Sequence, residues 1–70
     1  MSPERRKDLT DAYIRTCRDS GFKLTYVAAA HFVAQLMKSH PLSVMKAVGG
    51  LDNLKSIAAG THPVCAEKSK

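Results

Sequence analysis

The sequence predicts an all-α protein in which three to four short helices surround a central apolar helix. Apolar residues recur every three or four positions along most of the chain, and no segment shows the alternation that is typical of a strand. Gly or Pro interrupts the pattern wherever a helix is expected to end. With 70 residues the chain allows one domain, which we place over residues 1–60.

The first helix is expected over about residues 3–20. Ser2 can cap its N-terminus, and Pro3 suits the first helical position, where a missing N–H leaves no bond unmade. Gly21 suits the left-handed residue that follows many helices. An apolar stripe, which is expected to face the core, repeats every four residues and consists of Leu9, Tyr13 and Cys17.

The first turn of this helix carries a basic cluster that the helix dipole disfavours. Arg5, Arg6 and Lys7 all stand there, and positive charge at a helix N-terminus costs about 0.3–1 kcal/mol per residue. Two interpretations stay open. Either the helix begins near Asp8 and the preceding residues are frayed and solvated, or the basic cluster is retained for a partner.

The central helix is expected over residues 26–39, between the cap residue Thr25 and the dipeptide His40-Pro41. Its apolar residues cover about 220° of the circumference at about 100° per residue. A helix that packs on one layer needs a stripe only a little wider than about 100°. This helix is therefore expected either to be enclosed by the other three or to form a homodimer interface. The interface residues would be Tyr26, Ala29, Ala30, Phe32, Val33, Leu36 and Met37.

Two short helices follow, over about residues 41–48 and 51–59. Their ends are marked by Gly49-Gly50 and by Gly60. The glycine turn between them faintly resembles those of helix-turn-helix and helix-hairpin-helix motifs. Because Asp52 would repel a phosphate at this turn, we interpret the glycines as a helix stop.

Residues 61–70 are expected to form a disordered tail. They contain Pro63, show no apolar periodicity and carry three charges among the last four residues. Such a segment can bury little apolar surface, so its ordering entropy would not be repaid.

The composition favours no catalytic, metal or cofactor site. The candidate metal ligands are Cys17, His31, His40, His62 and Cys65, and no pair among them has the spacing of a structural zinc site. Cys17 lies on the apolar stripe, so we expect a packed thiol and not a nucleophile. A pocket of about 300 Å³ or more is not expected in so small a chain. We therefore expect no enzyme activity and no cofactor.

The sequence also favours a cytoplasmic protein without membrane association. Its longest uncharged stretch, residues 24–37, is shorter than the about 20 apolar residues that span a bilayer. Residues 1–8 are charged and no signal-peptide core follows them. Cys17 and Cys65 are too few for a secreted disulfide scaffold, so both are expected to be reduced thiols.

Binding to another macromolecule is the function that these features favour. Our first prediction is a regulator or inhibitor that covers a surface of a target protein, of a size that would suit an accessory product of a phage or plasmid. Arginine is enriched at the energetic centres of interfaces. The expected partner contacts are therefore Arg5, Arg6, Arg15 and Arg18.

The alternative is a small nucleic-acid-binding protein or transcriptional regulator. The formal net charge of +5 permits this function, although the positive charge is spread along the chain and does not form one patch. The nucleic-acid contacts would then be Lys38, Lys46 and Lys55.

Overall fold

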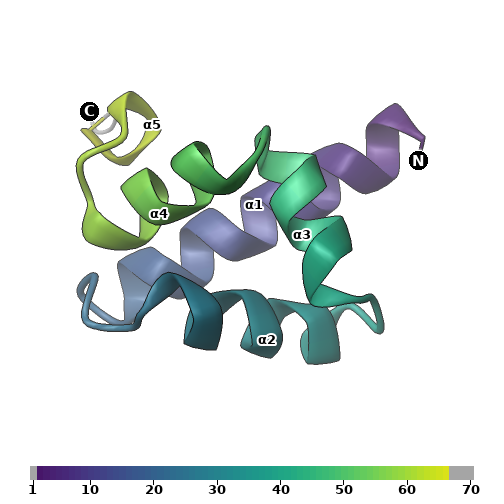
Figure 1. Cartoon of the computed structure of the whole chain (residues 1–70), viewed down its shortest axis with the longest axis horizontal. Helices are drawn as coiled ribbons and strands as arrows, with labels where there is room; N and C mark the ends of the chain where they lie inside the picture. The colour runs from purple at the N-terminus through teal and green to yellow at the C-terminus, as the bar shows by residue number, and fades with distance from the viewer. Residues whose placement is uncertain (1, 67–70) are drawn as a thin grey trace.

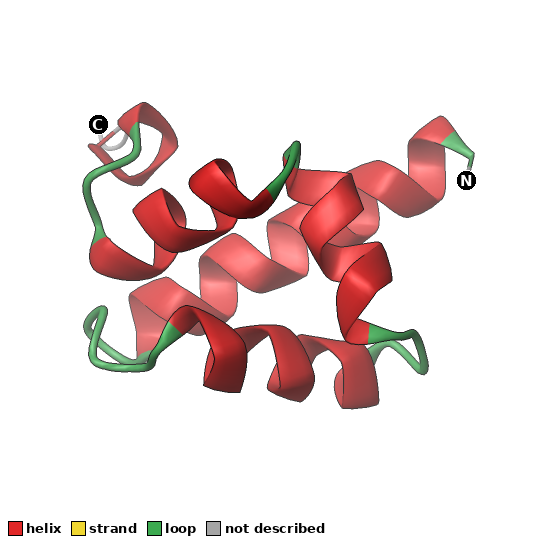
Figure 2. Cartoon of the chain, in the orientation of Figure 1, coloured by secondary structure: helices red, strands yellow, loops and turns green. Residues whose placement is uncertain are grey.

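The computed structural model describes residues 2–66, and all regular structure in this range is helical (Figure 2), which confirms the prediction of an all-α protein. The helices are α1 (Pro3–Asp19), α2 (Tyr26–Leu36), α3 (Pro41–Val48), α4 (Leu51–Ala59) and α5 (Pro63–Ala66). In Figure 1, α1 runs across the back and α2, α3 and α4 lie in front of it, each in contact with α1. Among the described helices, none combines the length and apolar character that a membrane span requires.

The start of α1 follows the sequence prediction. Ser2 is the cap residue, and its hydroxyl accepts a hydrogen bond from the backbone N–H of Arg5 at 3.2 Å. The predicted stripe of Leu9, Tyr13 and Cys17 is fully buried. The Tyr13 hydroxyl donates to the backbone carbonyl of Leu54 at 2.7 Å, which ties α1 to α4 through the core.

α2 covers one side of the bundle. One half of its wide apolar arc is buried against the other helices, and the other half is exposed. The buried half consists of Ala29, Ala30, Val33 and Ala34. The large apolar side chains of the exposed half are Val27, Phe32 and Leu36. Within a single chain, the small buried residues let α2 approach its neighbours closely, and the other half of the arc faces outward.

α2 ends at Leu36, three residues before the predicted end at Ser39. Lys38 adopts a left-handed conformation with φ of 54°, and the Ser39 N–H donates to the carbonyl of Ala34 at 2.7 Å. The Lys38 N–H donates to the carbonyl of Gln35. These two bonds form the Schellman motif that commonly closes a helix. Glycine usually marks this position, so a lysine there gave no signal of a helix end.

Lys38→Gly is expected to stabilise the protein. A left-handed conformation costs an L-residue about 1–2 kcal/mol, and the greater unfolded-state entropy of glycine offsets part of that gain. The free energy of unfolding should rise by about 0.5–1 kcal/mol, measured by urea denaturation. Lys38→Ala is the matched control, because it removes the same charge but retains the strain. An alanine variant as stable as the glycine variant would contradict this explanation.

The segment after Gly60 differs from the predicted disordered tail. Gly60 has a φ of 79° and ends α4, after which the chain forms the short helix α5. Val64 and Cys65 pack against the core. These two apolar side chains lie too close together in sequence to show a helical period. Residues 67–70 of the predicted tail lie outside the described residues.

Candidate functional site

Among residues 2–66, five large apolar side chains are between 43% and 61% exposed, and they line two grooves beside α2. Phe32 and Leu36 line a groove between α1 and α2, which we name the α1–α2 groove. Val27, Leu42 and Leu51 line a second groove between α2, α3 and α4, which we name the α2–α3–α4 groove. Both grooves are open to solvent.

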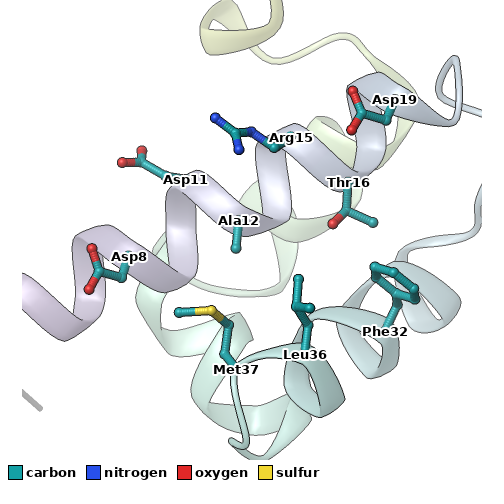
Figure 3. Close-up of a pocket in the computed structure, with 9 residues that line it drawn as sticks. All are labelled: Asp8, Asp11, Ala12, Arg15, Thr16, Asp19, Phe32, Leu36 and Met37. Atoms are coloured by element: carbon teal, nitrogen blue, oxygen red, sulfur yellow. The ribbon is translucent and has the colours of Figure 1, made fainter.

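The α1–α2 groove is an apolar trough with a volume of about 400 Å³, larger than the sequence led us to expect. Figure 3 shows that Phe32 and Leu36 of α2 and Met37, the residue that follows α2, point toward α1, while Ala12 and Thr16 point back from α1. A shallower depression of about 270 Å³ continues the trough past Thr16 and Phe32 as far as Leu24. The apolar floor is therefore continuous along both helices.

The α1 side of this groove is acidic. The charged residues that line it are Asp8, Asp11, Arg15 and Asp19, all exposed and all from α1 (Figure 3). Three carboxylates and one guanidinium give this wall a formal charge of −2, whereas the whole chain carries +5. Half of the six acidic residues in the sequence thus lie along one wall of one groove.

The α2–α3–α4 groove differs in its charge. None of the described residues that line it is Asp, Glu, Lys or Arg; its walls are Tyr26, Val27, Ala30, His31, Pro41, Leu42, Met45, Leu51 and Leu54. Its volume is about 150 Å³. At its margin the Lys55 ammonium lies 5.4 Å from the centre of the Tyr26 ring, within the range of a cation–π interaction.

The structure separates the predicted dimer-interface residues into three groups. Ala29, Ala30 and Val33 are buried in the core of the single chain. Phe32, Leu36 and Met37 line the α1–α2 groove. Tyr26 lines the α2–α3–α4 groove. The residues of the predicted interface that are available to a partner therefore face two different grooves.

Arg5 and Arg6, two of the predicted partner contacts, form hydrogen bonds within the chain. The Arg5 guanidinium donates to the Met37 carbonyl and to the Ser39 hydroxyl, and Arg6 Nε donates to the Ala47 carbonyl at 3.2 Å. These carbonyls lie at the C-terminal ends of α2 and α3, where the helix dipole concentrates negative charge. Arg5 and Arg6 are tolerated at the start of α1 because they meet the negative ends of two other helices.

The remaining predicted cationic contacts are exposed but dispersed. Arg15 lines the α1–α2 groove, and Arg18 lies one turn further along α1. The lysines proposed for nucleic acid stand on three separate segments: Lys38 after α2, Lys46 on α3 and Lys55 on α4. Their contact with a partner stays a prediction.

The buried polar groups of α1 belong to the core and not to either groove. Burial raises the pKa of the Cys17 thiol above its usual value, which keeps the side chain protonated at neutral pH. Burial likewise raises the pKa of the Tyr13 hydroxyl, so it remains a hydrogen-bond donor. Among residues 2–66, no three His, Cys, Asp or Glu side chains are grouped so that they could hold a metal ion.

Comparison with known proteins identifies no relative. No family model matches the chain, and no curated protein or solved structure is significantly similar to it. The function must therefore be inferred from the two grooves and their chemistry.

Proposed function

We propose that this chain is a small protein-binding regulator or inhibitor that acts by covering a surface of a target protein, and that the α1–α2 groove is its binding surface. The observation that carries the proposal is the pairing of two apolar side chains, each more than half exposed, with a row of charged groups. Phe32 and Leu36 form the centre of the groove, and the charges of α1 form its edge. An apolar centre with a polar rim is the usual anatomy of a protein interface.

The charge of this groove favours a protein over a nucleic acid as the partner that docks there. Asp8, Asp11 and Asp19 would repel a phosphate backbone, whose contacts require Lys and Arg.

Cys17 and Cys65 are both free thiols, which supports a reducing compartment such as the cytoplasm.

An affinity pull-down from host lysate, with and without nuclease, tests this function. The unchanged protein should retain a nuclease-resistant target. Leu36→Asp should weaken retention about 30-fold or more, the loss expected for the centre of an interface. Leu51→Asp, an equally simple change in the α2–α3–α4 groove, is the matched control and should retain the target.

A contradictory result would favour the nucleic-acid alternative. In that case nuclease would remove the recovered material, and binding would fall steeply with salt. Gln substitutions at Lys38, Lys46 and Lys55 would then abolish binding, and Leu36→Asp would not.

We also propose that the chain forms a homodimer through the α2–α3–α4 groove. Two copies that each carry +5 repel one another, so the uncharged face offers the least repulsive contact. A two-fold contact brings the same surface of both copies together. At the α1–α2 groove, such a contact would set one row of carboxylates against another.

Leu42→Asp is expected to convert the dimer into a folded monomer, because the charge would be buried without a partner at the two-fold contact. Leu42 is exposed in the single chain, so its substitution should leave the helical circular-dichroism signal unchanged. Sedimentation equilibrium at tens of micromolar protein measures the mass, with Leu36→Asp as the control that should stay dimeric. A monomer mass for the unchanged protein would refute the dimer.

A further inference from the structure

The α1–α2 groove has the dimensions of a site for one helix. Its α1 wall extends from Asp8 to Asp19, which corresponds to about 16 Å at about 1.5 Å per residue, or about three helical turns. On the opposite wall, Phe32 and Leu36 stand four residues apart on α2 and point into the groove (Figure 3). An apolar trough between two helices is a common receptor for the apolar face of a third.

The two walls of the groove impose different chemistry on whatever occupies it. The α2 wall is formed by Phe32, Leu36 and Met37, which offer hydrocarbon and a thioether. The α1 wall carries Asp8 and Asp11 toward one end and Asp19 toward the other, with Arg15 between them. In Figure 3 the Asp11 carboxylate and the Arg15 guanidinium point away from α2, so these charged groups lie at the outer edge of the groove. An occupant therefore needs an apolar face for one wall and a mainly cationic flank for the other.

We propose that the occupant is a basic amphipathic helix of the target protein. Its apolar residues, at positions i, i+4 and i+7, would seat against Phe32 and Leu36. Lys or Arg residues on its flank would face Asp8, Asp11 and Asp19. This inference rests on the proposed function and specifies the chemistry of the target.

Charge complementarity favours this occupant over the others that an apolar groove could receive. An acidic helix would place carboxylates against carboxylates, and like charges at an interface oppose binding strongly. A second copy in two-fold contact would meet the same repulsion. A basic flank would gain from all three carboxylates, and the long stems of Lys and Arg would also cover the apolar floor.

Peptide binding to the full chain tests the inference. The probe is a fluorescein-labelled amphipathic helix of about 15 residues with leucines at i, i+4 and i+7 and lysines on one flank. The control peptide has glutamates in place of those lysines. In fluorescence anisotropy, the lysine peptide should bind at least tenfold more tightly at low salt, and the difference should shrink as salt screens the charges.

A charge-reversed protein provides the second half of the test. The triple variant Asp8→Lys, Asp11→Lys, Asp19→Lys alters only exposed side chains, so its circular dichroism should match that of the unchanged protein. Its preference should reverse toward the glutamate peptide. Equal binding of both peptides, binding of neither, or sedimentation showing that a second copy fills the groove would each overturn the inference.

The peptide experiment and the pull-down test different claims, so their outcomes distinguish the proposed function from the proposed basic helix. If Leu36→Asp still releases the target from the lysate while the two peptides bind equally, the proposed function stands and the basic helix is wrong. If Leu36→Asp leaves the target bound, the groove is not the binding surface and the proposed function fails first.

Discussion

Tyr13→Ala is expected to remove a large fraction of the free energy of unfolding. Tyr13 is the largest fully buried side chain, and its ring fills the core where α1 meets α4. Truncation of a buried aromatic residue to alanine costs about 3–5 kcal/mol. A domain of this size has about 4–10 kcal/mol of stability, so the loss is a large fraction of the total. Urea denaturation followed by circular dichroism measures it.

Tyr13→Phe distinguishes the contribution of the Tyr13 hydroxyl to stability from that of its ring. It should lower the free energy of unfolding by about 1 kcal/mol, because only the hydrogen bond to the Leu54 carbonyl is lost. Burial raises the pKa of Tyr13 in the folded state. Above about pH 10, the unfolded chain releases this proton and the folded chain does not, so stability should fall with rising pH.

The loss of stability at alkaline pH is therefore expected to come in part from the Tyr13 hydroxyl. Tyr13→Phe has no hydroxyl to titrate at this position, so its stability should fall less steeply above about pH 10. An identical alkaline decline in both proteins would show that the Tyr13 hydroxyl is not buried. A phenylalanine variant that equals the unchanged protein at neutral pH would show that the bond to Leu54 contributes nothing.

Arg5→Ala is expected to lower the free energy of unfolding by about 2–3 kcal/mol. The substitution removes charge-assisted hydrogen bonds to Met37 and Ser39, and such bonds contribute about 1.5–3 kcal/mol each when they are buried. Because Arg5 is only partly buried, solvent screening lowers the sum for the two bonds to about 2–3 kcal/mol. It also removes a positive charge from the C-terminal end of α2. Thermal and urea unfolding measure the change, and binding of the lysine peptide to the folded fraction should be unaltered.

Arg18→Ala is the matched control for Arg5→Ala. Arg18 is exposed on the same helix, and substitutions at such positions usually change stability by less than about 0.5 kcal/mol. If Arg5→Ala were as stable as Arg18→Ala but lost its target, Arg5 would be a partner contact and not a link between helices.

The helix boundaries were predictable where a local residue defines them. Ser2 with Pro3, the Gly49-Gly50 turn and Gly60 mark ends that the structure reproduces. The end of α2 was not predictable, because its left-handed residue is Lys38. A lysine carries no sequence signal for that conformation, which tertiary contacts such as the Arg5 bonds stabilise.

The candidate site was predictable only in part. Phe32 and Leu36 belong to the predicted interface because helical periodicity places them on an apolar arc. Periodicity cannot say which half of that arc the rest of the chain will bury. The acidic residues of α1 recur at helical spacing, which was a usable signal, but their position beside α2 depends on how the two helices pack.

The contacts of Arg5 and Arg6 likewise could not be predicted in full from the sequence. The sequence revealed that positive charge is unfavourable in the first turn of α1. It did not reveal the acceptors, because Met37 and Ala47 lie more than 30 residues away along the chain. Only the packing of α1 against the ends of α2 and α3 brings these groups together.

Chemical-shift mapping tests most directly whether the α1–α2 groove receives a protein partner. The uniformly ¹⁵N-labelled chain would be titrated with the target captured in the pull-down. The largest changes should fall on Ala12, Thr16, Phe32 and Leu36, and Leu36→Asp should abolish them. Changes confined to α3 and α4, around Lys46 and Lys55, would contradict the central claim.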